Sequence, residues 1–190
     1  MKFTAVLGAA LMISQATFAQ SASDKDVMTS DTFKGMALRN IGPSFMSGRI
    51  ADIEIDQTDP ATWYVGVASG GVWKTENAGT TWTPLFDKES VYSIGTVTID
   101  PSNKNVIWVG TGENDGGRHI SFGDGVYRSA DGGKTWKNMG LEKSEHIAEI
   151  IIHPDDPDTI WVASQGPLWS SGGERGVFKS TDGGKTWINT

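Results

Sequence analysis

Residues 126–136 read Val-Tyr-Arg-Ser-Ala-Asp-Gly-Gly-Lys-Thr-Trp, and residues 177–187 read Val-Phe-Lys-Ser-Thr-Asp-Gly-Gly-Lys-Thr-Trp. A third copy at 72–82 reads Val-Trp-Lys-Thr-Glu-Asn-Ala-Gly-Thr-Thr-Trp, with Asn where the other two copies have Asp. The closing tryptophans of the three copies lie 54 and 51 residues apart. A motif that recurs at this spacing indicates a chain built from three copies of one structural unit.

Each unit predicts four short antiparallel strands. In the first unit we expect them at 50–56, 62–67, 71–75 and 81–86, because stretches that alternate in polarity, such as Ile-Glu-Ile-Asp, suit a strand with two unlike faces. The motif fits the hairpin between the third and fourth strands. Its Asp or Asn can accept backbone N–H bonds, its Gly supplies a positive φ, and its Trp covers the apolar side. We assign this structural role to Asn77, Trp82, Asp131, Trp136, Asp182 and Trp187.

Four-stranded repeats of this length are typical of β-propeller blades. The sequence has 24 Gly and 8 Trp, and no segment has the periodicity of a capped helix. It therefore predicts an all-β fold, a β-propeller of four-stranded antiparallel blades at about 48–92, 93–145 and 146–190. Because a closed ring has about four to eight blades, we expect an incomplete ring truncated at the C-terminus. The remaining blades of a longer chain are then expected partners.

The N-terminus predicts export. Lys2 precedes an apolar run from Ala5 to Ile13, and small residues lead up to an expected cleavage after Ala19. We expect a signal peptide at 1–19 and a lead-in at 20–47. The apolar run is shorter than the roughly 20 residues that cross a bilayer. The sequence therefore predicts a secreted or periplasmic protein without membrane insertion.

The composition argues against several functions. The net charge of −7 disfavours nucleic acid and anionic membranes as partners. The chain contains no Cys, so it forms no disulfide and has no Cys nucleophile. No glycine-rich loop leads into a helix, and the run Asp155, Asp156, Asp158 lacks the spacing of a calcium loop. We therefore expect no cofactor and no metal.

The connection between the second and third strands is the variable part of the unit. It takes 5, 15 and 13 residues after Gly66, Gly110 and Ala163. Loops that lengthen on a rigid scaffold are the usual place for recognition or catalysis, although an insertion can also be merely tolerated. These loops supply the candidate catalytic carboxylates Glu113, Asp115 and Glu174, the candidate ligand-binding residues Arg118, His119 and Arg175, and also Asn114, Asp124 and Trp169.

The first strand of each unit is expected to be innermost and to line a central channel. The repeat places Arg49, Ser93 and His146 at the channel mouth, on the same face as the variable loops. Asp52, Thr96 and Glu149 follow three residues deeper. Arg49 and His146 are candidate ligand-binding residues, with pairing to a neighbouring carboxylate as the alternative for each.

The hairpin motif resembles the Asp-box repeat family, which includes sialidases, sortilin-type propellers, xyloglucanase-type glycoside hydrolases and photosystem II assembly factors. The resemblance covers about 48–187. With the lead-in 39–43, Arg-Asn-Ile-Gly-Pro, and the run 69–75, Ser-Gly-Gly-Val-Trp-Lys-Thr, the chain looks most similar to large bacterial sortilin-like propellers. Xyloglucanase-type enzymes have a catalytic Asp shortly before a Gly-Gly pair, whereas residues 67–71 here read Val-Ala-Ser-Gly-Gly. Arg49-Ile50-Ala51 resembles the sialidase Arg-Ile-Pro only in part.

Three functions follow from this resemblance. The first is a sortilin-like module that binds or scaffolds a protein or peptide. The second is a glycoside hydrolase, xyloglucanase-like or sialidase-like, acting on a glycan; this activity would need two carboxylates about 5 to 10 Å apart. The third is an assembly-factor propeller that uses its outer surface. We expect binding ahead of hydrolysis.

Overall fold

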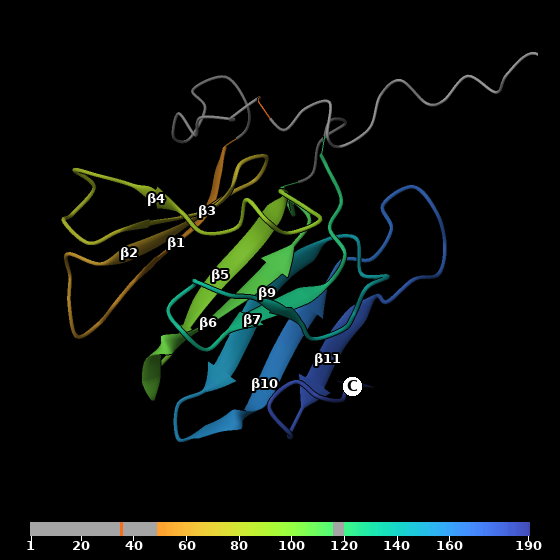
Figure 1. Cartoon of the computed structure of the whole chain (residues 1–190). Coiled ribbons are helices and arrows are strands. Elements are labelled where there is room, and N and C mark those ends of the chain that lie inside the picture. Colours follow the sequence, from red (N-terminus) through yellow and green to blue (C-terminus); the bar gives the residue numbers. More distant parts are fainter. Residues whose placement is uncertain (1–34, 36–48, 116–119) are drawn as a thin grey trace, which may run out of the picture. The chain divides into compact units, whose positions relative to one another are not determined.

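The computed structural model describes residues 49–115 and 120–190, together with Gly35 (Figure 1). The expected signal peptide, the lead-in apart from Gly35, and the candidates Arg118 and His119 lie outside the described residues. All the regular elements in the described ranges are β-strands. No helix in these ranges is long and apolar enough to cross a membrane.

Twelve strands form three four-stranded sheets, each in chain order and antiparallel throughout (Figure 1). The first sheet contains β1 (Ile50–Ile55), β2 (Trp63–Val67), β3 (Gly71–Thr75) and β4 (Thr83–Pro84). The second contains β5 (Ile94–Asp100), β6 (Asn103–Thr111), β7 (Val126–Ser129) and β8 (Lys137–Asn138). The third contains β9 (Ile147–His153), β10 (Asp156–Ser164), β11 (Gly176–Ser180) and β12 (Ile188–Asn189). The predicted fold class is confirmed, with three blades of an incomplete propeller.

The first strands of the three blades lie side by side, β1 against β5 and β5 against β9. The Asp52 carboxylate of β1 accepts hydrogen bonds from the Thr96 hydroxyl (2.8 Å) and the Val97 N–H (2.9 Å) of β5. The Thr98 hydroxyl of β5 donates to the Ile150 carbonyl of β9 at 3.1 Å. These strands therefore form the inner side of the array, and β4, β8 and β12 lie at the outer ends of their sheets.

The fourth strands are shorter than predicted. The sequence favours a strand over 81–86, but β4 contains only Thr83 and Pro84. The Asn77 side chain accepts the Thr81 N–H at 2.8 Å and so keeps that residue in the turn. Pro84 has no N–H with which to extend the ladder.

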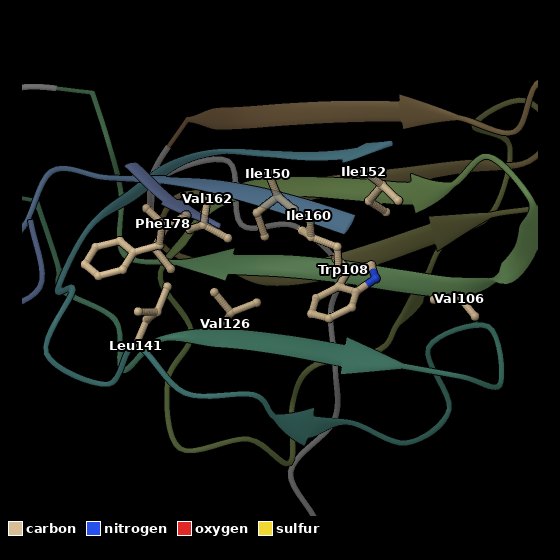
Figure 2. Close-up of a cluster of buried hydrophobic side chains, with 10 residues drawn as sticks. Val106, Trp108, Val126, Leu141, Ile150, Ile152, Ile160, Val162 and Phe178 are labelled. Atoms are coloured by element: carbon tan, nitrogen blue, oxygen red, sulfur yellow. The ribbon is translucent and has the colours of Figure 1, made fainter. Parts of the chain in front are cut away.

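Two apolar cores fill the spaces between neighbouring blades. In the core between the second and third blades, Trp108 and Val126 face Ile150, Ile160 and Val162 (Figure 2). The core between the first and second blades contains Tyr64, Val72 and Phe86 from the first blade, with further members from β5, β6 and β7. Burial of these side chains is the main stabilising contribution, since the chain has no disulfide.

The tryptophans of the second and third hairpin motifs each join two blades. Trp136 donates its indole N–H to the Leu85 carbonyl of the first blade (2.9 Å), and Trp187 donates to the Met139 carbonyl of the second (2.8 Å). We expected these rings only to cover their own hairpins. The second glycine of the motif also packs across the seam, because a Cβ on Gly184 would lie 2.5 Å from the Trp108 ring.

The motif carboxylate holds the turn. Asp131 Oδ1 accepts the N–H groups of Lys134 (3.0 Å) and Thr135 (2.9 Å), and Oδ2 accepts the Thr135 hydroxyl (2.6 Å). Asp182 makes the same bonds in the third blade. In the first blade Asn77 keeps the carbonyl role, and its amide donates to the Thr81 hydroxyl at 2.8 Å. Because the threonine hydroxyl can either donate or accept a hydrogen bond, either Asp or Asn can occupy this position of the motif.

Replacing Trp136 should destabilise the seam between the first and second blades. We expect Trp136→Ala to lower the free energy of unfolding by about 3 to 5 kcal/mol, the range for truncating a large core side chain. Trp136→Phe keeps an aromatic ring and loses the bond to Leu85, so we expect a loss of about 1 kcal/mol. Urea unfolding of both variants measures the difference. No loss in Trp136→Phe would contradict the role assigned to the indole N–H, and equal losses in the two variants would contradict the role assigned to the packed ring.

Acid should weaken the hairpin of the second blade. Bonds from the Thr135 hydroxyl and N–H, then from the Ser129 hydroxyl, lower the pKa of Asp131 to about 2. A carboxyl with a lowered pKa stabilises the fold above its unfolded pKa near 4, and this stabilisation is lost as the pH falls towards 2. Asp131→Asn should be tolerated better than Asp131→Ala, following Asn77. The stability gap between the unaltered chain and Asp131→Asn should narrow below pH 4 in denaturant titrations, and a constant gap would argue against this account.

Candidate functional site

Each first strand carries a β-bulge near its start. The strand register shifts around Ala51, Gly95 and Ala148, so each of these residues is an extra residue in its pair of strands. A bulge bends its strand and changes the direction of the neighbouring side chains. The position must be small in the second blade, because a Cβ on Gly95 would lie 2.0 Å from the Ile147 carbonyl oxygen.

Three residues predicted at the channel mouth lie two positions before these bulges, and all three contact Glu113 of the β6–β7 connection. Arg49 Nε forms an ion pair with Glu113 Oε1. The Glu113 N–H donates to the Ser93 hydroxyl at 2.9 Å. His146 Nδ1 lies 2.8 Å from the Glu113 carbonyl oxygen, which requires a hydrogen on Nδ1. The sequence placed these side chains at one mouth, and the structure adds their common partner.

The loop around Glu113 is tied to the third blade as well. Asn114 donates from its side chain to the Ala148 carbonyl, and Gln165 donates to the Asn114 carbonyl, both at 3.0 Å. The Glu113 side chain is only 2% exposed, while that of Arg49 is 52% exposed. Glu113 is therefore a buried carboxylate held by a half-exposed cation. This burial favours a bridging role between blades over a role as a general acid.

The other candidate carboxylates lie apart from this cluster. Asp115 is exposed. Glu174 accepts the Lys143 N–H at 2.8 Å through Oε2, and the Arg175 guanidinium donates to the Pro167 carbonyl. Within the described ranges, no hydrogen bond or ion pair joins Glu113, Asp115 or Glu174 to one another. The catalytic assignment of these three residues stays a prediction.

The inner strands carry carboxylates of their own. Burial, and then the charge of Asp52, raises the pKa of Glu54 on β1. The same two causes, in the same order, raise the pKa of Glu149 on β9. The inner surface is therefore acidic. No group of three or more possible metal ligands occurs among the described His, Asp and Glu residues.

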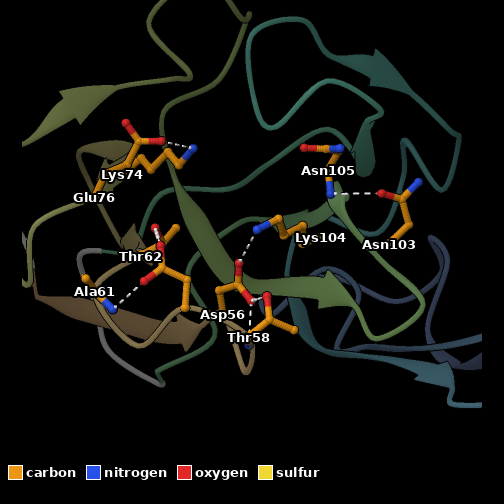
Figure 3. Close-up of polar contacts among 10 residues, drawn as sticks. Asp56, Thr58, Ala61, Thr62, Lys74, Glu76, Asn103, Lys104 and Asn105 are labelled. Carbon is orange, nitrogen blue, oxygen red and sulfur yellow. Dashed lines mark hydrogen bonds and ion pairs between the residues drawn. The ribbon is translucent and has the colours of Figure 1, made fainter.

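One hollow lies on the opposite face, beside the turns between the first and second strands. It has a volume of ≈ 620 Å³ and surrounds the turns after β1 and β5. Asp56 accepts the N–H (2.8 Å) and the hydroxyl (2.7 Å) of Thr58, and its Oδ2 lies 3.8 Å from Lys104 Nζ (Figure 3). Asp100 holds Ser102 in the same way. The carboxylates of Asp56 and Asp100, which line this hollow, therefore hold the two turns.

The exposed aromatic side chains gather on the mouth face. Of the aromatic residues in the described ranges, the exposed ones are Tyr92 (59%), Phe122 (68%) and Trp169 (80%). They lie in the β4–β5, β6–β7 and β10–β11 connections, which in an antiparallel blade open on one face. Of these three, only Trp169 was among the residues predicted from the sequence. The sequence feature that could have indicated Tyr92 and Phe122 is an aromatic residue in a loop of small and polar residues.

Two hollows meet beside Tyr92. One, of ≈ 580 Å³, is lined by 90–92 and 120–124, and the other, of ≈ 330 Å³, is lined by 69–71, 86–87 and 89–92. Residues 90–92 border both hollows, and the two hollows, which lie side by side between the first and second blades, are here together called the aromatic groove. At its base, the hydroxyls of Ser90 (2.6 Å) and Tyr127 (2.9 Å) both donate to Asp124 Oδ2.

The described residues form three blades of an incomplete β-propeller, with its longer connections on one face. No model of a known protein family matches the chain. A xyloglucanase of Acetivibrio thermocellus is 26% identical over 203 aligned residues, which cover 98% of this chain and 22% of the relative. A probable oligoxyloglucan-reducing end-specific xyloglucanase of Neosartorya fischeri is 22% identical over 108 residues, 55% of this chain and 12% of that protein. The chain therefore spans about a fifth or less of these curated relatives.

Solved structures agree on the fold. A GH74 enzyme of Niastella koreensis has a TM-score of 0.55 and 26% identity, over 75% of this chain and 21% of that chain. The GH74 xyloglucanase of Xanthomonas campestris has a TM-score of 0.53 at 18% identity, over 75% and 21% of the two chains. YCF48 of Cyanidioschyzon merolae has a TM-score of 0.51 at 20% identity, over 77% and 38%. These similarities support a propeller like those of glycoside hydrolases and do not extend to the finer sortilin-type resemblance.

Removing the Arg49 cation should lower the free energy of unfolding, because the buried Glu113 carboxylate would lose its partner. We expect Arg49→Met to destabilise the chain by about 2 kcal/mol, less than for a fully buried pair because Arg49 is half-exposed. Glu113→Gln in the same chain removes the uncompensated charge and should restore part of the loss. Thermal unfolding of the two single variants and the double variant measures the coupling. Additive losses would show that the ion pair does not hold the mouth.

Proposed function

We propose that these three blades belong to an exported β-propeller that binds a glycan chain across its long-loop face. The observation that carries the proposal is the gathering of Tyr92, Phe122 and Trp169, the exposed aromatics of the described ranges, on that one face. Flat apolar rings exposed to water on a rigid scaffold are suited to stacking against a ligand. The xyloglucanases among the relatives support a glycan as this ligand.

We propose binding without hydrolysis by these blades. A glycoside hydrolase needs a pair of carboxylates across the scissile bond. Residues 67–69, before the Gly-Gly pair, contain no carboxylate where the xyloglucanase-type motif has its Asp; Ala68 there is buried, and its N–H donates to the Arg49 carbonyl at 3.0 Å. Glu113 lies nearby along the mouth, but it is buried and paired with Arg49. These two features argue against a carboxylate pair at this part of the mouth.

The similarity to xyloglucanases favours a glycan over a protein or peptide as the ligand. The sequence alone favoured a sortilin-like site for a protein or peptide, and this remains the second candidate. A solved YCF48 bound to a D1 peptide has 15% identity and a TM-score of 0.50, a likeness of fold alone. In a hydrolytic whole protein, a candidate such as Asp115 or Glu174 would pair with a carboxylate of further blades; this chain spans 22% of the xyloglucanase of Acetivibrio thermocellus.

Other parts of the proposal rest on the sequence. Export rests on the signal-like segment 1–19 and its expected cleavage after Ala19. The Asp-box assignment rests on the three hairpin motifs and on the bonds made by Asn77, Asp131 and Asp182. Peptide mass analysis of the exported protein would test the cleavage site.

Affinity electrophoresis in gels that contain xyloglucan polysaccharide tests the function. We expect the chain to be retarded relative to gels without polysaccharide, and we expect no new reducing ends after prolonged incubation. A heat-unfolded sample is the control for nonspecific retention. Unretarded migration would contradict glycan binding. Reducing ends that disappear with Asp115→Asn or Glu174→Gln would instead favour hydrolysis.

A further inference from the structure

We propose that the aromatic groove between the first and second blades is a binding site for an uncharged sugar unit, with Tyr92 and Phe122 as its stacking surfaces. This inference rests on the proposed glycan binding and deepens it in two respects. It gives the ligand a place that lies beside the channel mouth, and it specifies the charge class of the sugar.

The size of the groove suits a short stretch of a polymer. Its two adjoining hollows have volumes of ≈ 580 Å³ and ≈ 330 Å³. Small-molecule sites have volumes of about 300–1,000 Å³. Because both hollows open at the surface, a sugar unit of a longer polymer can reach them.

Both aromatic residues are held on fixed backbone. The Tyr92 carbonyl accepts the Gly71 N–H at 2.8 Å across the first blade. On either side of Phe122, the Ser121 carbonyl accepts the Ser93 hydroxyl at 2.7 Å, and the Gly123 N–H donates to the Glu145 carbonyl at 2.7 Å. Two exposed rings on a fixed backbone lose little conformational freedom when they bind a ligand. The negative face of each ring attracts the C–H bonds on the flat side of a sugar.

The polar groups of the groove specify the charge of the sugar. Glu89, Asp124 and Asp87 line it, and its described lining residues include no Lys, Arg or His. These carboxylates repel a second anion, and the half-buried Glu89 carboxylate can accept hydrogen bonds from sugar hydroxyls. Burial, and then the charge of Asp124, already raises the pKa of Glu89, so a further negative charge would be unfavourable there. Acidic sugars such as uronates and sialic acids are therefore disfavoured.

Charge also separates this groove from the rest of the mouth. The cations Arg49 and His146 lie in the Glu113 cluster, where Arg49 is paired with Glu113 and His146 faces the Glu113 backbone. An anionic sugar would need a free cation, and the described lining of the groove supplies none. Aromatic rings among carboxylates also suit a basic peptide. The similarity to xyloglucanases favours the sugar, and the experiment includes the peptide as a competing ligand.

Isothermal titration calorimetry with the full chain tests the inference. The probes are a neutral xyloglucan heptasaccharide, a galacturonic acid heptamer and hexalysine. We expect Tyr92→Ala and Phe122→Ala each to weaken heptasaccharide binding about tenfold, equivalent to about 1.4 kcal/mol. Ile188→Ala is the control, because Ile188 is an exposed apolar residue of β12 in the third blade and lies outside the groove. It should change the affinity less than twofold, and all three variants should keep the melting temperature of the unaltered chain.

Several outcomes would overturn the inference. Undiminished heptasaccharide binding by the Tyr92→Ala, Phe122→Ala double variant, or its loss in Ile188→Ala, would place the sugar elsewhere and leave glycan binding standing. Tighter binding of the galacturonic acid heptamer would refute the charge argument, and tighter binding of hexalysine would assign the groove to a basic peptide. If xyloglucan does not slow the migration of the unaltered protein in gels, and the protein binds no heptasaccharide, the proposed function itself is wrong.

Discussion

The contact between one blade and the next is the interaction on which the whole structure depends. Each fourth strand has a ladder of only two residues, so the carbonyls just beyond it have few partners in their own sheet. Trp136 and Trp187 of the following blades supply the missing donors, at the Leu85 and Met139 carbonyls, while their rings fill the seam. The outer edge of one blade is therefore completed by its neighbour, and no blade is an independent folding unit.

The architecture was predictable because it depends on periodicity. The spacing of the three motifs, together with strands that alternate in polarity, gave three four-stranded blades with their first strands innermost. The fourth strand was overpredicted because Thr-Trp-Thr-Pro-Leu-Phe has strand-forming composition, whereas the Asn77 or Asp131 side chain captures part of it in the turn. The bulges were missed, although the small residues Ala51, Gly95 and Ala148 recur after Ile at equivalent positions.

The mouth was predictable only in part. Aligning the repeats brought Arg49, Ser93 and His146 to one place, because equivalent positions in blades share a face. Their convergence on Glu113 depends on the path of the β6–β7 connection. This path could not be predicted, because the connection does not repeat from unit to unit. Tyr92 and Phe122 come together for the same reason: one follows β4, the other follows β6, and only the packing of two blades makes them walls of one groove.

The hairpins keep one length and one pattern across the three units, whereas the connections on the other face run from 5 to 15 residues. The tryptophan contacts between blades are thus on the face opposite the variable connections, and only the part of the β6–β7 connection around Glu113 and Asn114 also joins blades. Mutation can lengthen, shorten or rewrite the rest of these connections without disturbing the contacts between blades. A duplicated blade carries its own attachment points with it. A scaffold of this kind can diversify its ligands faster than its core can change.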